Sequence, residues 1–223
     1  MFCSISTFNF PGCTNELHDS SITYSNRGVL NGYGTIELLL GNISFLENNV
    51  TRNYCEGITA FGMGYGTSSI KYSIIDENYA DSGICWTGYF PSKYNSIVFI
   101  NNTVSKPDRF IGMIYCEHCD VTLENCFIAN NKQNGQYLFG IEYDTGSIRV
   151  SNTCIDTTEL LYEEGQDVTI DQKNEISIKL HLLSTELCPT GYYFVCMKKC
   201  NKIIFTELFR LRGFEKSLAS LIP

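Results

Sequence analysis

The chain has 223 residues, 43% of them hydrophobic and including 14 Tyr and 14 Phe, so it can bury one substantial core and is not a disordered chain. Its net charge of −8 is unevenly placed: residues 1–197 carry ten basic and 22 acidic side chains, and residues 198–223 carry six and two. A body this acidic excludes binding to a nucleic-acid backbone, which requires clustered Lys and Arg.

The cysteine count and the N-terminus point to different compartments. Eleven cysteines are many for a cytosolic chain and an odd number for a fully paired secreted one. The N-terminus shows neither the basic nor the continuous apolar segment of a signal peptide, and no stretch reaches the roughly 20 apolar residues that span a bilayer. A fragment of a longer surface protein would reconcile these observations.

Residues 1–35 predict an irregular first coil or cap, because they are rich in turn-forming residues and precede the repeat described next. The turn-forming residues are Pro11, Gly12, Asn26, Gly28, Gly32 and Gly34.

A repeat begins near Ile36 and continues to Thr158. Its first motif is Phe-x-x-Asn, which recurs about every 27 residues. The copies begin at Phe45, Ile75, Phe99, Phe127 and, in degenerate form, Cys154. A second motif, Gly followed by an apolar residue, keeps the same period. It lies at Gly57-Ile58, Gly83-Ile84, Gly112-Met113 and Gly140-Ile141. Two motifs with one period indicate a structural repeat.

Apolar and polar residues alternate within each repeat, which predicts two or three short strands per copy. After the Gly motif the alternation predicts that Ile84 and Trp86 face inward and Cys85 faces outward. Residues 30–160 contain no long segment with helical periodicity, so parallel strands can be joined only if the chain coils round. Propeller blades would need four strands in roughly 40–50 residues. The predicted fold is all-β: a right-handed parallel β-helix of about five to six coils over residues 1–187.

Equivalent residues of successive coils should stack into ladders. One inward column is predicted to consist of Phe45, Ile75, Phe99, Phe127 and Cys154. An asparagine ladder at a bend, where side-chain amides satisfy unpaired backbone groups, is predicted to consist of Asn48, Asn78, Asn102 and Asn130. Phe127 is expected to face inward and Ile128 outward, so a serine at 127 should destabilise more than one at 128.

Residues 159–187 resume the alternation and predict one more coil or a hairpin. Residues 188–223 predict a separate segment, which opens at Cys188 like a small cysteine-rich module and also contains Cys196 and Cys200. A loosely amphipathic pattern from Ile203 to Leu221 predicts a helix. Because its apolar face is discontinuous, a cap on the stack or a truncated terminus is favoured over a membrane-surface helix.

The joint recurrence of the two motifs resembles the repeats of the polymorphic outer-membrane-protein family, whose passenger domains are right-handed parallel β-helices of the pectin-lyase-like class. Similar repeats occur in surface proteins of parasitic protists. The resemblance covers about residues 36–158, although Glu56, Ser82, Ile111 and Phe139 replace the first Gly of the family's Gly-Gly-Ala/Ile motif. It implies a cell-surface or extracellular, adhesin-like role with a host or cell-surface protein or glycan as partner, and it implies no catalytic residue.

Cys116-Glu-His118-Cys119 is the most metal-like cluster in the sequence. Zinc usually needs two such ligand pairs, and the next group of cysteines lies far along the stack, so we expect no metal and no cofactor. The cysteines are then free or disulfide-bonded. Cys55, Cys85 and Cys116 follow one another at close to the length of one coil, which would bring neighbours within disulfide reach.

Three N-glycosylation sequons begin at Asn42, Asn49 and Asn101. If the protein is secreted by a eukaryote, Asn49 and Asn101 are the favoured acceptors, because each lies beside a predicted ladder asparagine and should point elsewhere.

A pectin-lyase-like carbohydrate-active enzyme is the alternative function. Such enzymes need paired carboxylates on adjacent coils, or Ca²⁺-binding acids with a basic residue. The candidate groups, none of which share a register across coils, are Asp76/Glu77, Asp108-Arg109 and Glu142/Asp144. The acidic body would also repel a polyanionic substrate. We therefore predict a non-enzymatic β-helical surface domain that binds a protein or glycan, with a structural spacer as a third possibility.

Overall fold

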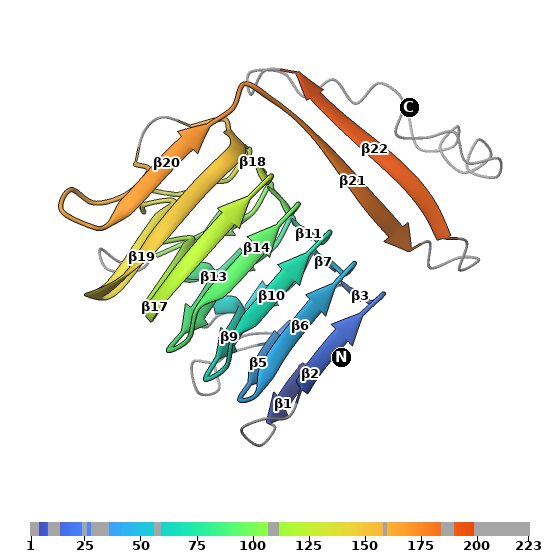
Figure 1. The fold of residues 1–223 in the computed structure, drawn as a ribbon, viewed down its shortest axis with the longest axis horizontal. Coiled ribbons are helices and arrows are strands. Elements are labelled where there is room, and N and C mark those ends of the chain that lie inside the picture. Colours follow the sequence, from blue (N-terminus) through green and yellow to red (C-terminus); the bar gives the residue numbers. More distant parts are fainter. Residues whose placement is uncertain are drawn as a thin grey trace.

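The computed structural model describes residues 5–8, 14–23, 26–27, 36–55, 59–106, 112–157, 160–183 and 190–198. These residues form strands and no helix, so none of them belongs to a helix long and apolar enough to cross a membrane. The chain winds into a parallel β-solenoid of about five coils, and an antiparallel hairpin follows it (Figure 1). The predicted all-β parallel solenoid is confirmed.

Each of the first four coils contains four short strands, where the sequence predicted two or three. The first coil consists of β1 (Ile5–Phe8), β2 (Thr14–His18), β3 (Ser21–Thr23) and β4 (Asn26–Arg27). The second consists of β5 (Ile36–Leu39), β6 (Asn42–Leu46), β7 (Asn49–Thr51) and β8 (Tyr54–Cys55). The third consists of β9 (Thr59–Gly64), β10 (Ser68–Lys71), β11 (Ile74–Asp76) and β12 (Tyr79–Ala80). The fourth consists of β13 (Gly83–Gly88), β14 (Ser92–Asn95), β15 (Val98–Ile100) and β16 (Thr103–Val104).

In the later coils the short strands merge into longer ones that bend at the corners. The merged strands are β17 (Ile114–Glu124) and β19 (Phe139–Ile155), while β18 (Phe127–Ala129) between them stays short. After them β20 (Val168–Gln172) adds one more parallel strand beside β19. The strands β1 to β4 pair in parallel register with β5 to β8. The described part of residues 1–35 therefore forms a first coil, as one of the two expected forms, and it pairs with the second coil in the same way as the later coils pair.

The core lies inside the coil, and Phe45, Ile75 and Phe99 of the predicted column fall into two of its stacked columns. The first column follows the second strand of each coil and contains Leu17, Phe45, Ile70, Tyr94, Leu123, Val150 and Ile170. The second follows the third strand and contains Ile22, Val50, Ile75, Phe99, Ile128 and Ile155. Phe45 thus lies in a different column from Ile75 and Phe99, which corrects the predicted single column.

Phe127 and Cys154 belong to a third column, on the outer face of the solenoid. Phe127 pairs with Val98 and Cys154, whereas its neighbour Ile128 pairs with Phe99 in the core. The inward and outward assignments of Phe127 and Ile128 are therefore reversed relative to the prediction. The sequence could not reveal this reversal. Both side chains are only 1% exposed and both positions are apolar, so no polar residue marks the outward one.

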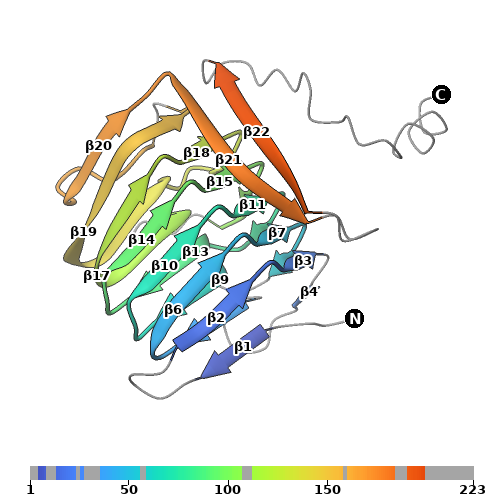
Figure 2. The same cartoon turned by 45° about the vertical axis from the view of Figure 1, so that its right-hand side comes forward.

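The hairpin explains why this outer face is apolar. It consists of β21 (Glu175–Leu183) and β22 (Thr190–Lys198), which pair in antiparallel register across the predicted division at 187/188. Ile176 and Ile178 of β21 form one buried cluster with residues of the outer face, namely Val98, Ile100, Phe127, Ala129 and Cys154. Figure 2 shows β21 alongside β18, β15, β11 and β7. The predicted helix between Ile203 and Leu221 lies outside the described residues.

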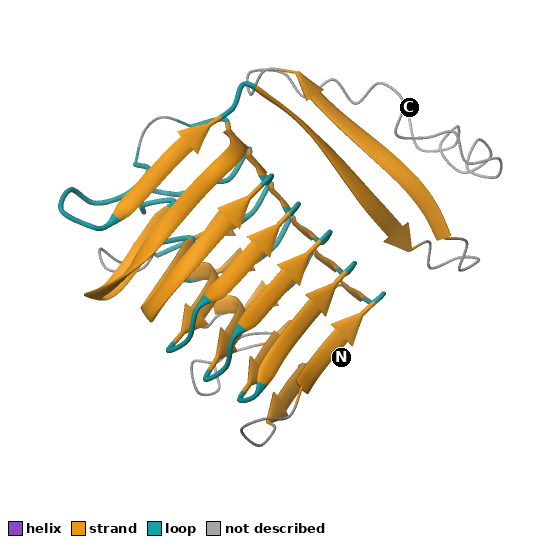
Figure 3. Ribbon diagram, in the orientation of Figure 1, coloured by secondary structure: helices purple, strands orange, loops and turns teal. Residues whose placement is uncertain are grey.

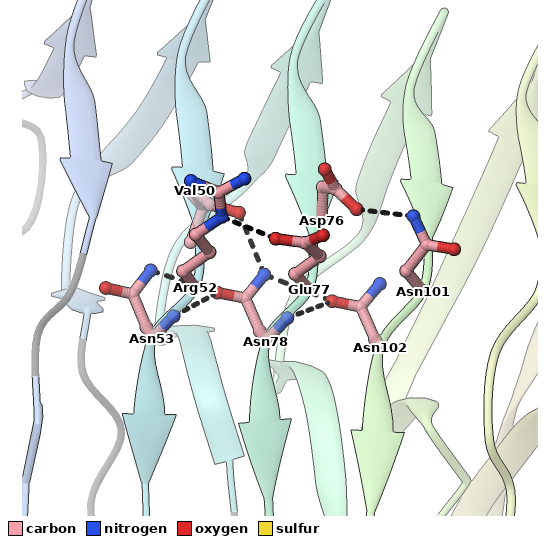
Figure 4. A network of polar contacts seen from close by, with 8 residues as sticks. All are labelled: Val50, Arg52, Asn53, Asp76, Glu77, Asn78, Asn101 and Asn102. Atoms are coloured by element: carbon pink, nitrogen blue, oxygen red, sulfur yellow. Dashed lines mark hydrogen bonds and ion pairs between the residues drawn. The ribbon is translucent and has the colours of Figure 1, made fainter. Parts of the chain in front are cut away.

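The asparagine ladder holds the bend that follows the third strand of each coil (Figure 4). Three successive side-chain Nδ2 atoms each donate to the Oδ1 of the asparagine in the next coil, at 3.0–3.1 Å. The ladder consists of Asn53, Asn78, Asn102 and Asn131. Asn78 and Asn102 occupy the predicted places.

Two of the four predicted ladder asparagines need correction. Asn48 lies at the preceding bend, where its backbone N–H donates to Ser73 Oγ and its Oδ1 accepts from the Ser20 N–H. Asn130 is exposed, and Asn131 takes its place in the ladder. The repeated motif is thus an inward apolar residue three positions before the ladder asparagine, as in Ile128-x-x-Asn131. Phe127-x-x-Asn130 is displaced from it by one residue.

Candidate functional site

The most prominent exposed feature is a row of four aromatic side chains, which we call the ridge: Tyr65, Tyr89, His118 and Tyr143. Each residue stands at the bend between the first and second strand directions of its coil, with a φ of 62°, 70°, 52° and 64° respectively. Positive φ is uncommon for residues with a side chain and marks a sharp local turn. Figure 3 shows the bends that follow β9 and β13, which hold Tyr65 and Tyr89, as loops along one edge of the solenoid. His118 and Tyr143 lie at bends within β17 and β19.

The ridge rings stack on one another from coil to coil. The ring centroids of Tyr65 and Tyr89 are 4.5 Å apart, those of Tyr89 and His118 5.7 Å, and those of His118 and Tyr143 5.1 Å. The first and last pairs are within 11° of parallel. These separations suit offset stacking, and the ring faces are turned towards neighbouring coils. The ridge therefore presents ring edges and polar atoms to solvent, most of all at Tyr143, which is 61% exposed.

Trp86 lies beside the ridge on a floor of two glycines. A Cβ atom added to Gly64 would stand 2.6 Å from Trp86 Cη2, and one added to Gly88 would stand 2.6 Å from Trp86 Cζ2. The indole therefore lies across both glycines, one in its own strand and one in the adjacent coil. Because Trp86 is only half-buried, the ring offers surface to solvent. We call this arrangement the Trp86 platform.

Glu117 joins the Trp86 platform to the ridge. One carboxylate oxygen accepts a hydrogen bond from Trp86 Nε1 at 3.2 Å, and the other accepts one from the Tyr89 hydroxyl at 2.7 Å. The bond to Glu117 raises the pKa of Tyr89, and a bond to Glu142 likewise raises the pKa of Tyr143. Both phenols therefore stay protonated at neutral pH, in a site whose charge comes from carboxylates.

Sequence reasoning missed this site, because it placed Trp86 inward and did not consider the tyrosines together. The backbone N–H groups of Ile84 and Cys85 both donate to Met113 O, an irregularity that shifts the alternation by one residue. Cys85 consequently lines a core cavity of about 10 Å³ together with Phe99 and Tyr94, and Trp86 points outward. The available signal was an aromatic residue that recurs once per coil, in step with the repeat.

The metal-like cluster is divided between two faces of the solenoid. Cys116 and Cys119 are buried, whereas His118 is exposed and contacts Thr145 Oγ1 through Nδ1. Within the described ranges, no three His, Cys, Asp or Glu side chains are grouped so as to hold a metal ion.

The proposed disulfides between coils do not form. Cys55, Cys85 and Cys116 are all thiols. None lies opposite another, because Cys55 pairs with Ala80, Cys85 with Ile114 and Cys116 with Thr87. Cys154 is disulfide-bonded, and its partner is not one of the five described thiols at Cys55, Cys85, Cys116, Cys119 and Cys126.

The three sequon asparagines differ in accessibility. Asn42 is exposed and accepts a hydrogen bond from Thr67 Oγ1 at 2.9 Å. Asn101 is also exposed, and its amide donates to Asp76 Oδ1 at 2.8 Å. Asn49 is half-buried beside Ile74 in the outward column. Glycosylation at any of them stays a prediction.

The acidic groups weighed for catalysis occupy different settings. Asp76 accepts from Asn101, and Glu77 pairs with Arg52 at 2.5 Å, so both act in contacts between coils (Figure 4). Burial raises the pKa of Asp76. Glu142 lies beside the ridge and hydrogen-bonds to Tyr143, and Asp108-Arg109 and the side chain of Asp144 lie outside the described residues.

Neither family models, curated proteins nor solved structures give a match to this chain. Its function is therefore inferred from the chemistry of the Trp86 platform and the ridge.

Proposed function

We propose that the protein is a non-enzymatic, surface-displayed solenoid that binds a glycan on the Trp86 platform and the ridge. The observation that carries the proposal is the indole of Trp86, held across Gly64 and Gly88 and hydrogen-bonded to Glu117. The likeness of the repeats to those of adhesin-like surface proteins supports display outside the cell.

An indole fixed in this way suits a sugar ring. The face of an aromatic ring carries partial negative charge, which attracts the weakly positive C–H groups on the apolar face of a pyranose. The carboxylates of Glu117 and Glu142 can accept hydrogen bonds from sugar hydroxyls, and the ridge phenols can donate to or accept from them. Because tyrosine and tryptophan lose few rotatable bonds on binding, a preorganised aromatic surface binds at low entropic cost.

The dimensions and charge of the site narrow the ligand further. The ridge crosses four coils, and three steps of about 4.8 Å give a line of about 15 Å, which accommodates several sugars. The carboxylates beside it favour neutral or amino sugars over polyanionic ones.

A glycan array followed by titration of the hits tests the proposal. Trp86→Ala should weaken binding at least about tenfold, equivalent to about 1.4 kcal/mol. Gly88→Ala should do the same, because the added methyl group displaces the indole without removing it. Tyr72→Ala is the matched control, since Tyr72 is an exposed tyrosine at another bend.

Two results would overturn the proposal. The first is an array without hits, or hits that Trp86→Ala binds as tightly as the parent protein does. The second is depolymerisation of a bound polysaccharide, polygalacturonate included, which would establish an enzyme in place of a binding protein.

A further inference from the structure

Two buried cysteines lie on either side of one ridge residue. Cys116 and Cys119 belong to β17 and are separated by Glu117 and His118, where the chain bends and the pairing register with β19 shifts. Cys116 is fully buried and Cys119 is 5% exposed. Both side chains therefore turn inward beneath the bend, while His118 points outward into the ridge.

The two thiols lie at the same place in the coil. Cys119 Sγ donates to the Thr87 carbonyl oxygen at 3.4 Å, and Thr87 is the residue that pairs with Cys116 in the adjacent coil. The side chains of Cys116 and Cys119 also hydrogen-bond to each other. The corresponding positions in adjacent coils hold Thr87 and Ile141 opposite Cys116, and Gly146 opposite Cys119. The thiol pair thus distinguishes this coil from its neighbours and is not required by the repeat.

We propose that Cys116 and Cys119 are a redox-active dithiol that closes to a disulfide beneath His118, locking the bend that carries Glu117. The proposal does not depend on the glycan-binding function. Two cysteines three residues apart can form a disulfide where the chain bends so that both side chains face the same way, as Cys116 and Cys119 do at the bend at His118.

The hydrogen bond assigns different roles to the two sulfurs. It lowers the pKa of Cys119, and the same bond together with burial raises the pKa of Cys116. Since the thiolate is the nucleophile, Cys119 should react first, when local opening of the bend admits the oxidant.

Oxidised glutathione supplies a balanced reaction. The Cys119 thiolate attacks one glutathione sulfur, breaks the glutathione disulfide and forms a mixed disulfide, releasing one glutathione thiolate. Cys116 then loses its proton and attacks the Cys119 sulfur, expelling the second glutathione thiolate. The protein has lost two electrons and two protons, and two molecules of reduced glutathione have formed.

Cys85 and Cys126 provide internal controls. Burial raises the pKa of both thiols, in the case of Cys126 to about 12. Buried thiols of this kind are unreactive while the protein is folded. Any reagent that reached the dithiol only through global unfolding would modify these two residues as well.

The test incubates the native full chain with oxidised glutathione, alkylates the remaining thiols and maps the peptides by mass spectrometry. The parent protein should give a Cys116–Cys119 disulfide, with Cys85 and Cys126 alkylated. Cys116→Ser should retain glutathione on Cys119, because the serine hydroxyl can still donate a hydrogen bond to Cys119 but cannot resolve the mixed disulfide. Cys119→Ala should leave Cys116 unmodified.

Three results would overturn the proposal. The first is the absence of the Cys116–Cys119 disulfide from the native parent protein. The second is as much glutathione on Cys116 in Cys119→Ala as on Cys119 in the variant that lacks Cys116. The third is oxidation of Cys85 or Cys126 at the same rate as the dithiol. The parent protein alone decides the first and third, even if a variant fails to fold. Glycan binding is measured separately, so its absence would leave this outcome unaffected.

Discussion

Asn78 shows how single side chains hold the bends of the solenoid. Its Nδ2 donates to Val50 O and to Asn102 Oδ1, and its Oδ1 accepts from both the backbone and the side chain of Asn53. Asn78→Ala would leave buried backbone groups unsatisfied, each at a cost of about 1–3 kcal/mol. We expect a loss of at least about 2 kcal/mol in the free energy of unfolding, measured by urea denaturation.

The matched control is Asn130→Gly, at an exposed asparagine one residue from the ladder. Glycine readily adopts the φ of 55° found at this position, so the substitution introduces no backbone strain. Its effect should stay within about 0.5 kcal/mol. Equal losses in the two variants would contradict the ladder register.

Asp76 and Asp167 should give opposite pH dependences of stability. Burial raises the folded-state pKa of Asp76 above its ordinary 3.8, so its favourable contribution is present below that pH and is lost as the pH rises through the folded pKa. Arg149 lowers the pKa of Asp167, so its contribution is present above pH 3.8 and is lost as the pH falls through the folded pKa.

Thermal melts between pH 2.5 and 7 test this pair. Relative to the parent protein, Asp76→Asn should gain melting temperature as the pH rises, and Asp167→Asn should lose it. The assigned pKa shifts would be wrong if the melting temperatures of both variants, relative to the parent protein, changed in the same direction with pH.

The repeat period was enough to predict the solenoid, but not which side chains of every strand point into the core. The strands Val98–Ile100 and Phe127–Ala129 are buried on both faces, so no polar residue marks an outer side. Register is specified by sequence only where one face is polar. The hairpin that covers the outer face comes only after β19 and β20, too far along the chain for local alternation to reveal it.

The same limit applies to the candidate site. Stacking of the ridge follows from a period that is visible in the sequence, yet the inward or outward choice at Trp86 depends on the irregularity at Ile84 and Cys85. The contact between Glu117 and Trp86 joins residues 31 positions apart. Predicting such a contact requires the register between coils to be known to within one residue, and the motif spacing alone does not give it.

Phe127 and Ile128 test the corrected strand register. Both Phe127→Ala and Ile128→Ala should destabilise, by about 2–5 kcal/mol each, because both side chains are buried. Only Phe127→Ala should also speed hydrogen exchange in β21, since Phe127 packs against Ile176 and Ile178. Faster exchange in β21 with Ile128→Ala alone would restore the original register.

Across the whole molecule, the outward column changes character along the solenoid axis. It runs from polar to apolar through Ser21, Asn49, Ile74, Val98, Phe127 and Cys154. The hairpin residues Ile176 and Ile178 pack on the apolar part. The solenoid core forms a separate buried cluster inside the coil, so the hairpin and the core rest on distinct apolar contacts.

Ile178→Asp tests whether the hairpin can leave while the solenoid stays folded. Ile178 is 1% exposed, and an unpaired carboxylate is too costly to bury in that cluster. We expect β21 and β22 to become sensitive to protease and the uncovered patch around Val98 and Phe127 to drive self-association, seen by sedimentation. Thr169→Asp, an exposed position on β20, should change neither property. Loss of all β-structure in Ile178→Asp would instead mean that the solenoid depends on its hairpin, because the two apolar clusters would then unfold as one cooperative unit.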